Sequence, residues 1–325
     1  MVGSAATSSD GVLRPAVEVE GPSPSGEVRP VECGRPVEES LRVPAGRTVG
    51  SVVPLEIERL SILGGRGRQG DLERVARVDL RMGEVVSIVG PTGSGKTELI
   101  NDIERFADAN TPSGRRVLIN DLPMPEESIG DPSRNPVALI TQHTNFLSDL
   151  PVREFLRIHA EIRQGADVTE LIGRTVEFAN ELTGEAIDME SAMTELSGGQ
   201  TRALLIADAV VIGNSPIILL DEIENAGIHR TRALELLRRH RKIFVFVTHD
   251  PRIALLSDVR VVMRNGAMQK LIPKDARERP VADALSRLDD IIVEYRAKIR
   301  AGEPLDDAVL GEQLARALRP GSVSP

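Results

Sequence analysis

Short apolar runs recur along the middle of the chain, and each run is short enough to be a buried strand. They lie at 84–89, 137–141, 217–220 and 243–248. Between them, apolar residues return with a helical period, which predicts helices at 98–107, 152–163, 168–182, 199–211 and 230–239. Strands that alternate with helices in this way indicate an α/β domain with a largely parallel sheet.

The regions before and after this α/β stretch have different patterns of apolar and polar residues. Ahead of the α/β region, 53–58 and 72–80 predict strands on either side of a glycine-rich loop at 64–70. Behind it, Asn265-Gly266 separates apolar runs at 259–263 and 268–271. This dipeptide favours a tight hairpin turn, so a two-stranded hairpin is expected there.

The ends of the chain differ from the middle. Residues 1–50 are rich in Pro, Gly, Ser, Val and Glu, and their prolines exclude a continuous helix, so a disordered arm is predicted. The tail at 275–325 is predicted to be helical from Pro280 onward. Its apolar positions are spaced 4-3-4-3-4, at Val281, Leu285, Leu288, Ile292, Tyr295 and Ile299. This seam is shorter than three heptads and fits either a helix docked on the domain or a contact with a partner.

A glycine-rich loop connects the strand at 84–89 to the helix that follows. Its residues are Gly90, Pro91, Thr92, Gly93, Ser94, Gly95, Lys96 and Thr97. Gly90 and Gly95 allow a tight turn whose N–H groups point at phosphate oxygens, and the helix adds its positive end. Lys96 is expected to reach the β- and γ-phosphates, and the Thr97 hydroxyl to bind Mg²⁺. The complete motif in this setting predicts that the chain binds MgATP.

Composition and charge narrow the function classes. The 325 residues carry 40 basic and 49 acidic side chains, a net charge of −9, and aromatic residues make up 2%. Direct nucleic-acid binding is therefore not expected, since it favours a basic surface or stacking aromatics. The single cysteine, Cys33, excludes an internal disulfide. Neither a signal peptide nor a membrane-spanning run is present in the sequence, so a cytoplasmic protein is expected.

The strand at 217–220 ends in the acidic pair Asp221-Glu222. At the end of a buried strand, Asp221 is placed to hold Mg²⁺ directly or through water. Glu222 is placed to polarise the attacking water as a general base. An acidic pair at a strand end is usually solvated, but the phosphate loop upstream favours the catalytic interpretation.

The segment Leu196-Ser197-Gly198-Gly199-Gln200 makes a family resemblance specific. With both nucleotide motifs in order, the chain resembles the ATP-binding cassette (ABC) ATPases, whose signature is LSGGQ. Ser197 and the amides of Gly198 and Gly199 begin a helix, which suits an anion. The simpler alternative is an N-cap with a glycine turn.

The resemblance implies roles for two more residues. Gln142 follows the strand at 137–141, at the place of the family's Q-loop, and would sense Mg²⁺ and the attacking water. His249 follows the strand at 243–248, at the place of the switch histidine, and would contact the γ-phosphate.

The resemblance also implies an architecture and partners. The fold would be a P-loop NTPase (RecA-like) core at 51–274, with an antiparallel β subdomain and an α-helical signature subdomain at about 143–200. Two cassettes would pair head to tail in a homodimer, and the signature of one, including Gln200, would close on the ATP held by the other. A separate transmembrane permease is the partner of transporter cassettes, which would place the chain peripherally at the inner face of a membrane.

Two features depart from the family pattern. In the stretch 223–229, Ile223 replaces a proline and His229 takes the place of an aspartate, which affects the expected coupling across the dimer. No aromatic residue lies between 52 and 90 to stack on adenine, so Arg66 or Arg68 is the candidate, with solvated loop arginines as the alternative.

Three functions fit these observations. The first is the ATP-binding subunit of an ABC transporter, which the short signature subdomain favours. The second is a soluble ABC ATPase that remodels a protein or nucleic-acid partner, which the arm, the altered loop and the tail favour. The third, a clamp that binds ATP without hydrolysis, is disfavoured by Glu222 and His249.

Overall fold

The computed structural model describes residues 56–129, 135–141, 144, 148–163, 167–222 and 230–318. All of them belong to the unit Leu55–Pro325. The predicted arm at 1–50 lies outside the described residues. The division of the rest into 51–274 and 275–325 stays a prediction.

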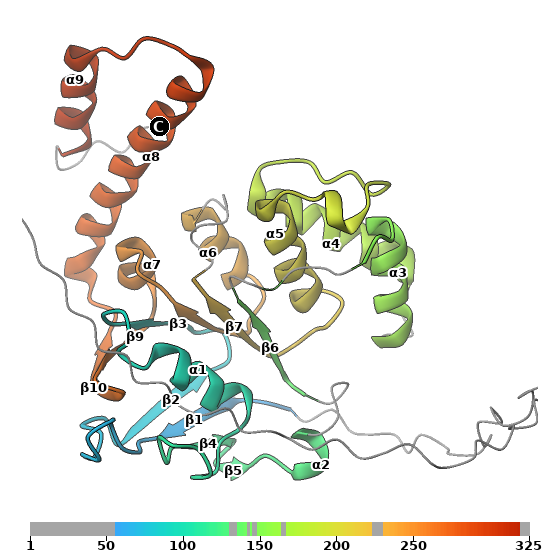
Figure 1. Cartoon of the computed structure of the whole chain (residues 1–325), viewed down its shortest axis with the longest axis vertical. Helices are drawn as coiled ribbons and strands as arrows, with labels where there is room; N and C mark the ends of the chain where they lie inside the picture. Colours follow the sequence, from blue (N-terminus) through green and yellow to red (C-terminus); the bar gives the residue numbers. More distant parts are fainter. Residues whose placement is uncertain are drawn as a thin grey trace, which may run out of the picture. The chain divides into compact units, whose positions relative to one another are not determined.

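A six-stranded sheet forms the centre of this unit (Figure 1). Its order is β10-β9-β3-β8-β7-β6, and every neighbouring pair is parallel except β9 with β10. The strands are β3 (Val85–Val89), β6 (Val137–Ile140), β7 (Ile217–Asp221), β8 (Ile243–Val247), β9 (Val259–Arg264) and β10 (Ala267–Pro273). The four predicted core strands and the hairpin are confirmed. At the hairpin turn, Asn265 and Gly266 have φ values of 52° and 80°, as a type I′ turn requires.

A second, antiparallel sheet has the order β2-β1-β4-β5. Its strands are β1 (Arg59–Leu63), β2 (Arg77–Arg81), β4 (Arg116–Ile119) and β5 (Leu122–Pro123). This sheet is the antiparallel β subdomain that the family resemblance implies. The α/β fold class with a P-loop core is thereby confirmed.

Two strand predictions near the start were misplaced. A strand was predicted at 53–58, but β1 begins at Arg59; the part of the prediction at 53–55 lies outside the described residues. The N–H groups of Glu58 and Arg59 donate to the Asn120 side chain, so the alternation at 56–58 reflects the burial of Ile57 rather than strand pairing. The strand predicted at 72–80 begins only at Arg77, because the residues before it form a loop around the buried carboxylate of Glu73, which accepts the Gly65 N–H.

The two faces of the central sheet carry separate hydrophobic cores. On β7 and β8 the side chains alternate: Ile218 and Phe244 belong to one core, and Leu219 and Val245 belong to the other. The first core is covered by α3 (Val152–Arg163), α4 (Val168–Thr183), α5 (Gly198–Val210) and α6 (Arg230–Arg238). The second is covered by α1 (Lys96–Glu104) and the antiparallel sheet. Helices α1 and α5 therefore pack on opposite faces of the sheet (Figure 1).

The tail is helical, as predicted. It comprises α8 (Arg279–Ala301) and α9 (Asp307–Ala317), and α8 contacts α7 (Pro251–Leu256). Buried Arg252 of α7 forms an ion pair of 2.5 Å with Asp289 of α8. Near its start, α8 docks on the domain through buried Ala282. Val281, Ile292 and Ile299 of the predicted seam are 53%, 49% and 61% exposed, so much of the seam remains in solvent.

The remaining described elements are short: α2 (Glu126–Ile129), η1 (Met193–Glu195) and η3 (Ala276–Glu278). Within the described residues, none of the helices has both the length and the apolar character needed to cross a bilayer.

Lys242, which directly precedes β8, gives a prediction about how stability depends on pH. Burial lowers the pKa of its ammonium to about 8, although Nζ donates to Asn214 and to the Ser215 carbonyl. Between about pH 8 and about pH 10.4, the ordinary lysine pKa, the unfolded chain binds a proton at Lys242 that the folded chain has lost. The free energy of unfolding therefore gains a contribution from Lys242 as the pH rises through this window.

The comparison of the unaltered chain with Lys242→Gln isolates this contribution, because all other titrating groups are shared. In urea denaturation, we expect the stability difference between the two to be constant below about pH 8 and to move in favour of the unaltered chain above it. Two stability curves that stay parallel across the window would show that Lys242 has an ordinary pKa.

Candidate active site

The glycine-rich loop joins the end of β3 to the start of α1, as the sequence predicts. A Cβ atom on Gly90 would lie 2.4 Å from the Met263 carbonyl oxygen, and one on Gly95 would lie 2.8 Å from Gly266 Cα. Gly95 also has a backbone φ of 97°, a value that residues with a side chain rarely adopt. The loop therefore needs glycine at both positions, since it packs directly on β9 and on the hairpin turn.

The start of α1 is built to receive an anion. Gly95 is its N-cap and contributes no side-chain hydrogen bond, so the first N–H groups of the helix remain available. The Ser94 hydroxyl is buried, and the described residues offer it no hydrogen-bond partner. A buried hydroxyl beside uncapped amides is the arrangement that phosphate oxygens satisfy.

Lys96 and Thr97 follow the glycines of the loop at the start of α1. Buried Lys96 directs Nζ back over the loop, 3.0 Å from the Gly90 carbonyl oxygen and 3.3 Å from that of Pro91. Thr97 lies in the first turn of α1 and is exposed. Thr92 and Gly93, at the tip of the loop, are exposed as well.

Three parallel strands end at the same edge of the sheet as this loop. In their register, Asp221 of β7 is opposite Val247 of β8, and Val247 is opposite Ile88 of β3. The N–H of Thr248 donates to the Ile88 carbonyl at 3.3 Å. The residues that follow β3, β7 and β8 are therefore brought together, as expected for the carboxyl ends of parallel strands.

Glu222 and His249 lie in contact at this edge. Glu222 Oε1 is 3.2 Å from His249 Nε2, and both side chains are partly exposed. Glu222 has a φ of 50°, uncommon for a residue with a side chain, and its N–H donates to the Val247 carbonyl. Sequence reasoning identified both residues but missed the contact, because only the adjacency of β7 and β8 creates it.

A cavity of about 360 Å³ adjoins this region. Gly90 and His249 line it, together with Arg260 of β9 and residues of α7. It lies between the beginning of the phosphate loop and the His249 segment, so solvent or a ligand can reach both.

The signature segment is placed elsewhere. Ser197 is the N-cap of α5: its Oγ accepts the N–H of Gln200 at 3.2 Å, and Gln200 Oε1 accepts the N–H of Ser197 at 3.0 Å. Gln200 also donates to the Ala186 carbonyl. Since α5 and α1 cover opposite faces of the sheet, the chain itself does not bring Ser197 to Lys96.

Two parts of the predicted site lie outside the described residues: Gln142 and the stretch 223–229. Of the two candidate arginines, Arg66 donates to the Gly70 carbonyl at 2.9 Å. The Arg68 N–H donates to the Asn265 carbonyl, and a Cβ on Gly266 would lie 2.9 Å from Arg68 Cγ. Arg68 therefore packs on the hairpin turn beside the phosphate loop.

A phosphate loop at the end of a parallel strand, with an acidic pair ending a nearby strand, defines a P-loop nucleoside triphosphatase. Comparison with known proteins gives the family: residues 74–225 match the family model described as ABC transporter. An uncharacterized ABC transporter ATP-binding protein of Methanocaldococcus jannaschii is 45% identical over 251 residues, which are 77% of this chain and 96% of that protein. The chain belongs to the ABC transporter family and is an ATP-binding cassette ATPase.

Other relatives and structures agree. A spermidine/putrescine import ATP-binding protein of Bacteroides thetaiotaomicron is 31% identical over 213 residues, which are 63% of this chain and 44% of that protein. A dimeric ATP-binding cassette bound to ADP and Pi has a TM-score of 0.52 at 21% identity, with 67% of this chain and 99% of that chain covered. A component of a Clostridium perfringens ABC transporter complex has the same TM-score at 20% identity, with 76% and 100% covered. The two structural matches show the shared fold.

Proposed function

We propose that the chain binds MgATP on the phosphate loop and hydrolyses it at a site that two copies complete, as the ATP-binding subunit of a transporter. The observation that carries the catalytic part is the common edge of β3, β7 and β8. This edge gathers the phosphate loop, Asp221, Glu222 and His249.

In this proposal the loop amides and Lys96 hold the phosphates. The uncapped N–H groups of α1 and the buried Ser94 hydroxyl donate to phosphate oxygens. The Lys96 ammonium exchanges the carbonyls of Gly90 and Pro91 for the β- and γ-phosphates. Arg68, with its stem on the hairpin turn, is the candidate to stack on adenine.

The donor set fits Mg²⁺. This ion is usually held by one or two protein oxygens together with substrate phosphates and water, rather than by a cage of side chains. Thr97 supplies a hydroxyl, Asp221 supplies a carboxylate, and the described residues contain no cluster of three metal-binding side chains. When bound, Mg²⁺ would neutralise charge on the β- and γ-phosphates. By resemblance, Gln142 would join this set.

Glu222 and His249 act on the water and the γ-phosphate. Glu222 orients and polarises the attacking water, and His249 donates a hydrogen bond to the γ-phosphate. Their contact of 3.2 Å allows each side chain to hold the other in orientation, so the base and the phosphate sensor form one unit.

The second copy supplies the signature. Ser197, Gly198 and Gly199 present a hydroxyl and amides at the start of α5, which suit the γ-phosphate of an ATP bound to another chain. Two observations support this arrangement: the placement of α1 and α5 on opposite faces of one sheet, and the dimeric state of the ADP-bound cassette of similar fold.

The transport role rests on relatives whose names describe transporter ATP-binding proteins. It is tested by affinity purification of the tagged full-length chain from detergent-solubilised membranes and, separately, from cytosol. We expect a multi-span membrane protein to co-purify from membranes in amounts similar to the chain, because the ATP-binding subunit of a transporter acts on a membrane-spanning permease.

Recovery of soluble partners alone, from both fractions, would overturn the transport role and leave the ATPase assignment intact. It would favour the second candidate, a soluble ATPase that remodels a partner. The observation favouring that candidate is the α8–α9 tail, whose exposed apolar side chains include Ile292 and Ile299.

A further inference from the structure

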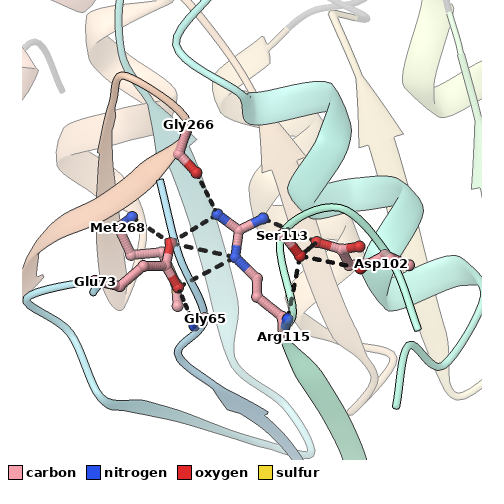
Figure 2. A network of polar contacts seen from close by, with 8 residues as sticks. Gly65, Glu73, Asp102, Ser113, Arg115, Gly266 and Met268 are labelled. Carbon is pink, nitrogen blue, oxygen red and sulfur yellow. Dashed lines mark hydrogen bonds and ion pairs between the residues drawn. The ribbon is translucent and has the colours of Figure 1, made fainter. Parts of the chain in front are cut away.

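A fully buried ionic network lies beside the phosphate loop (Figure 2). Its centre is Arg115, which directly precedes β4 and has no exposed surface. Nη2 donates to Glu73 Oε1 and to the Gly266 carbonyl, both at 2.6 Å, and Nη1 donates to Asp102 Oδ2 at 2.8 Å. One planar group therefore joins the loop before β2, helix α1 and the turn of the β9–β10 hairpin.

The two carboxylates extend the network into the surrounding backbone (Figure 2). Glu73 accepts the N–H of Gly65 at 2.8 Å and that of Met268 at 2.6 Å, so it ties the 64–70 loop to β10. Asp102, in the last turn of α1, also accepts the Ser113 hydroxyl at 2.8 Å. Every link is made by groups that are at most 8% exposed or by backbone.

Gly266 connects this network to the phosphate loop. Its carbonyl accepts from Arg115, and its N–H donates to the Ser94 carbonyl at 2.8 Å. Gly266 also touches Gly95, since a Cβ on Gly95 would lie 2.8 Å from Gly266 Cα. The position of the Gly266 peptide therefore fixes where the loop carbonyl of Ser94 lies, and with it the direction of the neighbouring amides.

The charges of the network do not balance. One guanidinium faces two carboxylates, and a negative charge in the last turn of a helix is itself unfavourable. An arrangement of this kind is a poor way to gain stability, because burial penalises each charge. What it provides is geometry: the rigid fork of arginine contacts three acceptors at fixed directions, which the single ammonium of lysine cannot do.

We propose that Arg115 is a positioning residue for the nucleotide site: through Gly266 it sets the phosphate loop, and through Glu73 it sets the Gly65 segment beside it. The proposal rests on the proposed function, since the ligand is MgATP. Arg115 contacts no phosphate itself. It acts by holding the loop amides in the orientation that binds the triphosphate.

The test is Arg115→Lys, with Arg238→Lys as the matched control. Arg238 also pairs with a carboxylate, Asp258, and donates to a backbone carbonyl, that of Leu256, but it lies on α6 and contacts no part of the phosphate loop. Titration calorimetry measures the MgATP affinity of each variant, and steady-state kinetics measures its KM and kcat. Both are done well below the melting temperatures of the two variants.

We expect Arg115→Lys to weaken MgATP binding and raise KM about tenfold, the effect of a displaced hydrogen-bonding loop. Its kcat at saturation should stay within about twofold of the unaltered value, because Glu222 and His249 follow other strands. The control Arg238→Lys should leave affinity, KM and kcat unchanged. Unaltered affinity in Arg115→Lys, or an equal loss in Arg238→Lys, overturns the positioning role. An unaltered chain that binds no MgATP overturns the proposed function instead.

A second variant covers the case in which Arg115→Lys does not fold. Asp102→Asn keeps the shape of the side chain and leaves Arg115 paired with Glu73, so no buried charge loses its last partner and we expect the variant to fold. Its weaker bond to Arg115 loosens α1, so MgATP affinity should fall about threefold. A lower melting temperature with unchanged affinity would identify the network as structural and refute the proposal.

Discussion

Lys96→Ala is expected to abolish measurable MgATP binding and hydrolysis while the chain remains folded. The ammonium is expected to make charge-assisted hydrogen bonds to two phosphates, so its loss should weaken affinity by about a hundredfold or more. Folding should survive because, among the described residues, Nζ donates to two loop carbonyls, those of Gly90 and Pro91. Titration calorimetry with MgATP and a melting curve measure the two properties separately.

Lys270→Ala is the control for this variant. Lys270 is an exposed lysine of β10, and its removal changes the net charge equally without touching the loop. We expect it to bind MgATP as the unaltered chain does. Micromolar MgATP affinity in Lys96→Ala would contradict the assignment of the phosphate loop.

Glu222→Gln is expected to retain MgATP binding and lose turnover. The amide keeps the size of the side chain and can still contact His249, but it cannot take a proton from water, so kcat should fall by about 10²–10⁴. Affinity should change little, since Glu222 is expected to face the water rather than the phosphates. Single-turnover hydrolysis at saturating MgATP gives the rate directly.

Asp283→Asn is a suitable control, because Asp283 is an exposed carboxylate of α8. It should hydrolyse MgATP at the unaltered rate. If Glu222→Gln turned over as fast as this control, Glu222 would not be the base, and the contact with His249 would need another explanation.

The sequence predicted the parallel core well because its signals are local. Strands such as β7 and β8 are continuous apolar runs, and a fully buried strand has that pattern wherever it lies in the chain. The antiparallel sheet was less predictable. The boundary of β1 depends on a hydrogen bond from Arg59 to the Asn120 side chain, 61 residues away, which no local pattern contains.

The site shows the same difference between local sequence signals and long-range contacts. The phosphate loop is a contiguous motif, and the structure gives Gly90 and Gly95 the tight packing that the motif implies. The Glu222–His249 contact and the Arg115 network are not contiguous: Glu73 and Arg115 are 42 residues apart, and Gly266 is 151 residues from Arg115. Such contacts appear only once the strand order places distant segments side by side.

If ATP completes a site between two copies of the chain, the molar mass of Glu222→Gln must depend on the bound nucleotide. Light scattering after size-exclusion chromatography should give a dimer in MgATP and a monomer in MgADP, because the variant holds ATP without consuming it. Adding Ser197→Arg to this variant should keep it monomeric in MgATP, since the signature can no longer close on the γ-phosphate. A mass that is the same in MgATP and MgADP, or a dimer that is indifferent to Ser197→Arg, would contradict an ATP site shared between two copies.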